Sequence, residues 1–485
     1  MSLDPLRRFE QRIGALPMPS PLVWAALIAA FLGFGVLLGR ATGNNAFDTL
    51  AAQRRPLKLL VAGAPTPATP GTASTSAPTT PPPAETETTP ELAPAASGES
   101  SKATQPPPAS KTNTTAGGSE KPFGGNREKS PKSPKATLTA IKHVWVVMLS
   151  DQPYATAFGP SSPAHYLTGT LEKQGKLLLR YYAVAHEELA NEIALLSGQG
   201  PTEATAANCP TYTEIAPAAA GSDGQVLGKG CVYPASTPTL MEQLTTKHLT
   251  WKAYVEGIDE GTGGAPACAH PASGAADPSA VQPNGQTALP SYQTWRNPFV
   301  YFQGIVVSPA CATHDVGMGE LGVDLGNEAR TPNFSYIAPG PCDDASPTAC
   351  APGKASGMMA ADAFLHKNVS RILSSKAYKK GGLLAITVDE APSSGEFEDS
   401  SSCCGQPQFP NLPAPTGAAA LGGPQGGGQV GLLLLSPFVK GGGLVQESYN
   451  HFSLLATIER VFGLAKLGYA GLPEVKAFSS ALFSG

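Results

Sequence analysis

Two apolar runs that end in acidic residues decide the fold of this sequence: residues 143–151, HVWVVMLSD, and residues 382–390, GLLAITVDE. Each run has the length and the flanking residues of a single buried strand. The acids are Asp151 at the end of the first run and Asp389 and Glu390 at the end of the second. In open α/β sheets, ligands lie outside the carboxyl ends of the strands. These acids therefore mark the edge where a functional site is expected.

Strand and helix patterns alternate around these two runs. Further strands are expected at residues 250–258, 334–340 and 430–438, and helices at 164–178, 188–199, 239–248, 360–375 and 452–464. This alternation predicts an α/β fold, a doubly wound and mostly parallel sheet with helices on both faces. Two Gly- and Pro-rich stretches, 257–290 and 391–428, are expected to be long insertions or lids.

The sequence before this region has a different character. Residues 21–39 carry no charge and are long enough to span a bilayer as a transmembrane helix, which would follow a cytoplasmic tail of residues 1–20. A cleaved signal peptide is the alternative, but no A-x-A site follows closely. Residues 40–137 are expected to form a disordered linker, because a segment rich in Pro, Thr and Ser buries too little apolar surface to fold. Residues 138–485 are left as the α/β domain.

The cysteines and the charge bear on location and partners. All eight cysteines lie beyond the linker without a zinc-type spacing, which favours disulfides and hence a domain outside the cytoplasm. Reduced, buried cysteines in a cytosolic protein are the alternative. The neighbouring pairs are Cys209 with Cys231, Cys342 with Cys350, and Cys403 with Cys404. The last two could also take separate partners, so the connectivity stays open. A net charge of −4 without a basic cluster in the domain argues against a nucleic-acid partner.

The strand-end acids suggest a chemistry. Burying the carboxylates of Asp151, Asp389 and Glu390 together is costly unless a cation or other partners neutralise them. A divalent metal ion would do so. The alternative is that each acid forms a turn or caps a helix, as acids after strands commonly do.

Seven segments carry a resemblance to one family and occur in the order expected for it. They are IKHVWVVML (141–149), YYAVAHEELANEIALLSGQ (181–199), LTWKAYVEG (249–257), RNPFVYF (296–302), FSYIAPGPCDD (334–344), LLAITVDE (383–390) and NHFSLLATIERVFGL (450–464). Together they resemble the phosphoesterase family that contains bacterial phospholipases C and acid phosphatases. The resemblance implies an alkaline-phosphatase-like fold and metal-dependent hydrolysis of phosphate esters.

The resemblance also implies which residues bind metal. It assigns this role to Asp151, Asp344, Asp389, Glu390 and His451. Three positions depart from the family pattern. The family's Glu-Asn pair after the first strand is Ser150-Asp151 here, its His-Asn-Pro motif reads Arg296-Asn297-Pro298, and a histidine two residues after Asp344 is Ser346.

A fourth departure falls on the nucleophile. The family motif is close to His-Pro-Ser-x-x-Asn, whereas residues 186–191 read HEELAN, so Glu188 stands where a serine attacks phosphorus. Glu188 could be phosphorylated itself, bind metal or act as a base toward a metal-bound water, or it could cap the following helix. His186 and Asn191 complete the motif. Arg296 could clamp a phosphate through two N–H groups, or form a salt bridge.

Two functions follow. The first is a single-pass membrane protein whose extracytoplasmic domain hydrolyses phosphate esters with a divalent metal ion. The second is a catalytically silent phosphoesterase-fold module that binds an envelope ligand or a protein, because the departures at Ser150, Glu188, Arg296 and Ser346 all fall on functional positions. A purely structural surface protein would leave the strand-end acids unexplained.

Overall fold

The computed structural model describes residues 138–260, 267–279, 290–347, 350–414 and 425–483. All of them belong to one compact unit, Glu120–Gly485. The predicted cytoplasmic tail, transmembrane helix (21–39) and linker (40–137) lie outside the described residues. Within the described part of the chain, no helix has the length and apolar character needed to cross a membrane.

Eight described strands form the central sheet, with β1 among its inner strands. In spatial order they are β11 (Leu444–Val445), β2 (Lys176–Leu178), β10 (Leu432–Leu435), β9 (Gly382–Val388), β1 (His143–Leu149), β8 (Phe334–Ala338), β6 (Trp251–Val255) and β7 (Asp315–Gly317). Neighbours run parallel except where β10 pairs with β9 and with β2. The predicted α/β fold with a mostly parallel sheet is confirmed.

The longer described helices form two groups. They are α5 (Glu188–Ser197), α6 (Leu240–Thr246), α9 (Gly319–Leu325), α10 (Gly357–Ser374), α11 (Lys376–Gly381) and α12 (His451–Phe462). Helix α5 contacts α6 and α12, whereas α10 contacts α9 and α11. Helix α12 begins after Asn450, whose side chain accepts a hydrogen bond from the Ser453 amide, and it ends at Gly463 in the left-handed conformation.

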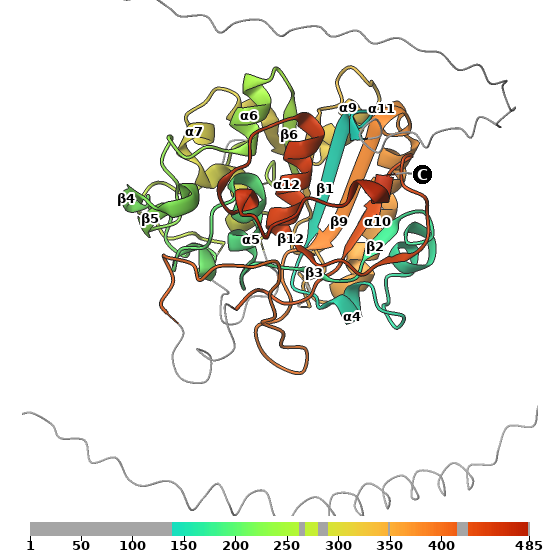
Figure 1. The fold of residues 1–485 in the computed structure, drawn as a ribbon, viewed down its shortest axis with the longest axis horizontal. Coiled ribbons are helices and arrows are strands. Elements are labelled where there is room, and N and C mark those ends of the chain that lie inside the picture. Colours follow the sequence, from blue (N-terminus) through green and yellow to red (C-terminus); the bar gives the residue numbers. More distant parts are fainter. Residues whose placement is uncertain (1–137, 261–266, 280–289, 348–349, 415–424, 484–485) are drawn as a thin grey trace, which may run out of the picture. The chain divides into compact units, whose positions relative to one another are not determined.

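Strands β1 and β9 determine at which edge of the sheet the candidate site lies. Every residue of both strands is buried, as their continuous apolar runs predict. The strands lie side by side although more than two hundred residues separate them in the chain (Figure 1). Leu149 pairs with Val388, so the segments that follow the two strands leave the sheet at the same edge.

One predicted element is wrong in its second half. The helix expected at 164–178 ends in a short π-helical segment, Leu167–Leu171, and residues 176–178 form strand β2 instead. Leu177 and Leu178 pair with Leu433 and Leu432 of β10, so sheet pairing outweighs the local helical pattern. Residues this apolar suit either structure until a neighbouring strand decides between them.

Four disulfides are present in the described domain, and none of its cysteines is free. Cys209 pairs with Cys231 and Cys342 with Cys350, as expected from their spacing. The remaining pairs are Cys268 with Cys311 and Cys403 with Cys404. The alternative of reduced cysteines is therefore wrong.

Candidate functional site

The segments that carry the acids after β1 and β9 meet at one edge of the sheet. The Asp151 amide donates a hydrogen bond to Oδ1 of Asp389 at 3.0 Å, and the Glu390 amide donates to the same oxygen at 2.7 Å. Asp151 adopts a φ of 45°, in the left-handed region that residues with a side chain rarely occupy. The two strand ends are held side by side by the pairing of Leu149 with Val388.

A buried arginine lies among the carboxylates at this edge. Arg296 ends a 3-10 turn, Thr294–Arg296, and its side chain is 2% exposed. Its Nη1 lies 2.5 Å from Oδ2 of Asp389 and 3.6 Å from Oε1 of Glu192. Its Nε lies 3.9 Å from Oδ2 of Asp344, and its Nη2 donates to the carbonyl of Met148 at 3.0 Å. The guanidinium therefore faces three carboxyl groups and one carbonyl.

Burial and charge act against each other in this cluster. Burial alone would lower the pKa of the Arg296 guanidinium, but Asp389, Glu192 and Asp344 outweigh that effect and raise it, so the group stays charged. Burial raises the pKa of Glu192 to about 8, although Arg296 opposes the shift. At pH 7 the carboxyl of Glu192 is therefore mainly protonated. Burial also raises the pKa of Asp389, although Arg296 opposes this shift, and the Asp389 carboxyl is the one closest to the guanidinium.

A second group of acids lines an open pocket next to this cluster. Carboxylate oxygens of Glu187, Glu188 and Glu390 lie within 4.8 Å of one another. The pocket has a volume of about 540 Å³ and is lined by Asp151, Glu187, Glu188, Ala207, Asn208, Pro210, Trp295, Pro347, Glu390, Pro392, Ser393 and Ser394. None of these described lining residues is a lysine, an arginine or a histidine. Arg296 is not among them.

Burial, with a smaller contribution from neighbouring acids, raises the pKa of three carboxyls in the pocket. Burial, followed by Glu188 and Asp344, raises the pKa of Asp151 to about 6. Burial, followed by Glu188 and Asp151, raises that of Glu187 to about 7. The pKa of Glu390 is also raised, first by burial and then by its acidic neighbours. These carboxyls share a pocket without a cationic side chain to offset them, so the pocket has an electrostatic potential that favours cations.

The side chain of Asn191 fixes the backbone of the loop that carries Glu187 and precedes Glu188. Its Oδ1 accepts hydrogen bonds from the amides of Val184 and Ala185, and its Nδ2 donates to the carbonyls of Ala185 and Glu187. Asn191 is fully buried. Its amide is thus fully used in fixing the backbone before α5, and we assign it a positioning role.

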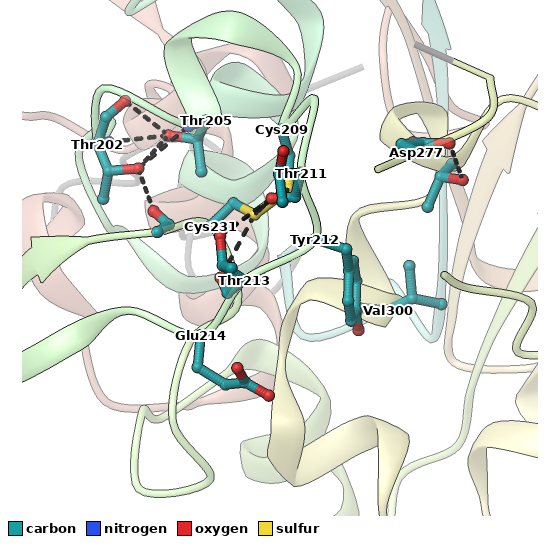
Figure 2. The surroundings of a disulfide bond; sticks show 12 residues. Thr202, Thr205, Cys209, Thr211, Tyr212, Thr213, Glu214, Cys231, Asp277 and Val300 are labelled. Carbon is teal, nitrogen blue, oxygen red and sulfur yellow. Dashed lines mark hydrogen bonds between the residues drawn. A yellow bond between two sulfur atoms is a disulfide. The ribbon is translucent and has the colours of Figure 1, made fainter. Parts of the chain in front are cut away.

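Asn208 reaches the pocket acids from another loop. Its Nδ2 donates to Oε2 of Glu187 at 2.9 Å and also to Oε2 of Glu188. Asn208 directly precedes Cys209, and the Cys209–Cys231 disulfide ties this loop to the segment that follows β5 (Val226–Lys229) (Figure 2). The disulfide therefore anchors the segment that carries Asn208.

The two histidines predicted for the site, His451 and His186, each contact other residues through both ring nitrogens. His451 is fully buried, and its ring nitrogens lie 2.8 Å from the Asp389 carbonyl and 3.0 Å from the Tyr181 hydroxyl. Burial lowers its pKa to about 4, so the ring is neutral at pH 7. His186 contacts Oε2 of Glu390 at 3.2 Å and the hydroxyl of Ser400 at 2.9 Å. His451 thus contacts the backbone of Asp389 and His186 contacts the carboxylate of Glu390, so both rings help to fix the position of the strand-end acids.

A family model describes most of the chain. Residues 135–465 match the model of the Phosphoesterase family. The chain belongs to the Phosphoesterase family. No curated protein sequence matches it.

Solved structures that resemble this phosphoesterase-family domain include three bacterial proteins. A protein in the alkaline phosphatase superfamily from Vibrio parahaemolyticus has 11% identity and a TM-score of 0.37, covering 69% of this chain and 70% of its own. A putative sulfatase from Bacteroides thetaiotaomicron has 10% identity and a TM-score of 0.40, covering 71% and 75%. A lipoteichoic acid synthase from Listeria monocytogenes has 9% identity and a TM-score of 0.37, covering 68% and 76%.

Ser150 and Glu188, two positions predicted to depart from the family pattern, lie close together in the structure. The resemblance predicts a carboxylate at the first position and the nucleophilic serine at the second. The two side chains still meet, because Oγ of Ser150 donates to Oε1 of Glu188 at 3.2 Å. Ser150 is fully buried, whereas Glu188 lines the pocket.

The predicted metal ligands fall into two sets. Asp344 and Asp389 do not fit a divalent ion, because the Arg296 guanidinium lies 2.5 Å from Asp389 in the space an ion would need. His451 offers no free ring nitrogen. Glu390, together with Glu187 and Glu188, does supply clustered oxygens of the kind that hard divalent ions prefer. Asp151 lines the same pocket but does not belong to this group of three.

Of the two roles expected for Arg296, a phosphate clamp or a salt bridge, the structure shows the salt bridge. Its three carboxyl neighbours leave no place for an anion. Sequence reasoning missed Glu187, Glu192 and Asn208 as members of the site. For Glu187 and Glu192 a signal existed, since three acids within residues 187–192 are unusual beside an expected active site. Asn208 is brought in by a loop and a disulfide, and no local pattern marks it.

Proposed function

We propose that this chain is a membrane-anchored, extracytoplasmic phosphoesterase-family domain that binds a positively charged ligand in its strand-end pocket and does not hydrolyse phosphate esters. The observation that carries the proposal is the pocket itself, in which Asp151, Glu187, Glu188 and Glu390 gather without a basic side chain among the described lining residues. The expected ligand carries an ammonium group, as a polyamine or an amine-bearing envelope component does.

The chemistry of the nucleophile position supports binding over turnover. A phosphoenzyme forms when a side chain at the pocket surface attacks phosphorus, and this side chain carries a hydroxyl in most cases and a carboxylate in some enzymes. Glu188 occupies that position, and the nearby hydroxyl of Ser150 is fully buried and donates to Glu188. A phosphate dianion would also meet several carboxylates of its own charge.

The size and lining of the pocket favour an organic cation. A volume of about 540 Å³ far exceeds that of one ion. Apolar surface from Ala207, Pro210, Trp295, Pro347 and Pro392 lines the pocket between the acids. A cationic head near carboxylates and a carbon body against apolar walls is the usual division in small-molecule sites.

Calorimetry on the full-length chain tests the proposal. Spermidine is expected to bind, with an affinity that falls as ionic strength rises. The double variant Glu187→Gln/Glu188→Gln should lose most of this binding. The matched control is Glu214→Gln, an exposed acid outside the pocket, which should leave it unchanged. Spermidine affinity equal in the wild type and the double variant would contradict the proposal.

Hydrolysis is tested on the same preparation. No turnover of aryl phosphate mono- or diesters is expected with Mn²⁺, Ca²⁺ or Zn²⁺. Because the hydroxyl, the carboxylate and the arginine all depart from the family motif, Glu188→Ser alone should also stay inactive. The triple variant Ser150→Glu/Glu188→Ser/Arg296→His, which restores the motif at three positions, is where activity would return. Turnover by the wild type that Glu390→Gln abolishes would overturn the proposal.

One observation favours a second function, a metal-dependent hydrolase. The oxygens of Glu187, Glu188 and Glu390 are close enough to hold a divalent ion. Such an ion would neutralise the charge of a phosphate ester at the pocket. In that case Asn208 would orient the two glutamates, and His186 would orient Glu390. Metal-stimulated turnover in the assay above distinguishes this function from ligand binding alone.

A further inference from the structure

A second cavity adjoins the acidic pocket and differs from it in charge. Its volume is about 290 Å³, and Ala207 and Pro210 line both cavities. We propose that the two cavities hold one elongated ligand, an amine-bearing peptide whose ammonium group lies among the pocket acids and whose carboxylate is bound by Lys229. This inference rests on the proposed function, because it names the ligand class of the same pocket.

The boundary between the two cavities is formed by short side chains. Ala207 and Pro210 are both exposed, and both belong to the loop that also carries Asn208. Glu187 and Glu188 line the first cavity on one side of this boundary, whereas the second cavity lies on its other side. A ligand whose cationic end occupies the first cavity therefore reaches the second one by passing over an alanine and a proline.

The charge changes from one cavity to the other. All the charged side chains among the described lining residues of the first cavity are acids. The second cavity is lined by one acid, Glu203, and one base, Lys229, which is the only cationic side chain among the described residues that line either cavity. A ligand with an ammonium group at one end and a carboxylate at the other matches this pattern. A second ammonium group at the far end would meet the like charge of Lys229.

The side chain of Lys229 can turn toward a ligand. Its Nζ lies 4.0 Å from Oε2 of Glu203, and the two side chains are 87% and 52% exposed. An ion pair this exposed and this long contributes little to stability. A ligand carboxylate can therefore replace Glu203 as the partner of Lys229 at little cost.

The wall of the second cavity is fixed before any ligand binds. Thr211 and Thr213 line it next to the Cys209–Cys231 disulfide (Figure 2). Gly230 lines it as well, and its carbonyl accepts a hydrogen bond from a buried threonine at 2.6 Å. The two threonine hydroxyls supply hydrogen-bonding groups of the kind that peptide amides use. A wall held in this way loses little freedom on binding, which favours affinity.

Calorimetry on the full-length chain with two synthetic peptides tests the proposal. Both peptides are acetylated at the amino end and have the sequence Lys-Ala-Ala, and one ends in a free carboxylate whereas the other ends in an amide. The wild type is expected to bind the free acid roughly threefold to fivefold more tightly than the amide, as suits one exposed ion pair. In Lys229→Gln the two peptides should bind equally. The matched control is Lys440→Gln, an exposed lysine outside both cavities, which should keep the difference.

A second variant tests whether the ligand occupies the second cavity. Thr211 is exposed and lines that cavity but not the first one. Thr211→Trp should fill the cavity and weaken binding of the free-acid peptide. The methylamide of acetyl-lysine has an ammonium group but no alanines and no carboxylate, and its affinity should be the same in Thr211→Trp and in the wild type.

Equal affinity of the wild type for the acid and the amide would overturn the inference. A preference for the acid that Lys229→Gln leaves intact would overturn it too. Spermidine separates this failure from a failure of the proposed function, since Lys229→Gln should bind spermidine at least as tightly as the wild type does. If spermidine binds and the two peptides do not differ, the proposed function stands and the peptide assignment is wrong. If the wild type binds neither spermidine nor peptide, both are refuted.

Discussion

The substitution Glu192→Gln should change how the stability of the domain depends on pH. Glu192 is fully buried beside Arg296, and burial raises its pKa from 4.5 to about 8. A carboxyl with a raised pKa binds its proton more tightly in the folded state. The stability it contributes is fully present below pH 4.5 and is lost as the pH rises through 8. The wild type should therefore lose stability over this window, and a neutral amide of the same shape should remove this part of the loss.

The magnitude follows from the pKa. Between pH 5 and a folded pKa of about 8 there are about three pH units, and each is worth about 1.4 kcal/mol, so Glu192 contributes up to about 4 kcal/mol. Urea unfolding of the wild type and Glu192→Gln at pH 5, 6, 7 and 8 measures this. The free energy of unfolding of the variant, relative to the wild type, should rise steadily with pH. The exposed Glu203→Gln is the control. Parallel curves for wild type and Glu192→Gln would refute the reasoning.

Further predictions concern the pocket. The affinity for spermidine should rise between pH 5 and pH 8. The pKa values of Asp151 and Glu187 are raised to about 6 and about 7, so these acids must lose their protons before they attract a cation. Calorimetry across this pH range measures the affinity, and a flat profile would mean that the two acids are not involved. Asn208→Ala should lower the free energy of unfolding by about 1–3 kcal/mol, because the carboxylates of Glu187 and Glu188 lose a hydrogen-bond donor. A urea midpoint equal to that of the wild type would show that Asn208 does not stabilise these carboxylates. Replacing Cys209 and Cys231 together by serine opens a loop with a sequence separation of 22, and this should lower the free energy of unfolding by about 3 kcal/mol, as measured with urea. The same double variant should bind spermidine more weakly. An unchanged affinity would mean that the disulfide does not position Asn208.

The sequence contains enough information to predict the sheet and the edge where its site lies. The apolar runs of β1 and β9 are buried throughout, and the acids that follow them meet because parallel neighbours end at the same edge. Strand β2 could not be predicted, because residues 176–178 become a strand only through pairing with β10. Its local pattern fits a helix equally well.

The charge balance of the site is the part that sequence reasoning missed. Arg296 comes from a turn far from β1 and β9 in the chain, and only the folded structure places it between Asp389, Asp344 and Glu192. Three-dimensional proximity of charges from separate elements has no local signature. The family motif drew attention to Arg296 as a departure, but the direction of its side chain decides whether it meets a phosphate or a carboxylate.

Anomalous diffraction from crystals grown in Mn²⁺ tests the central claim most directly. The account predicts that the guanidinium of Arg296 fills the space between Asp389 and Asp344 and that no anomalous peak lies there. A manganese ion bound to Asp389 and Asp344, with Arg296 turned away from both, would contradict it.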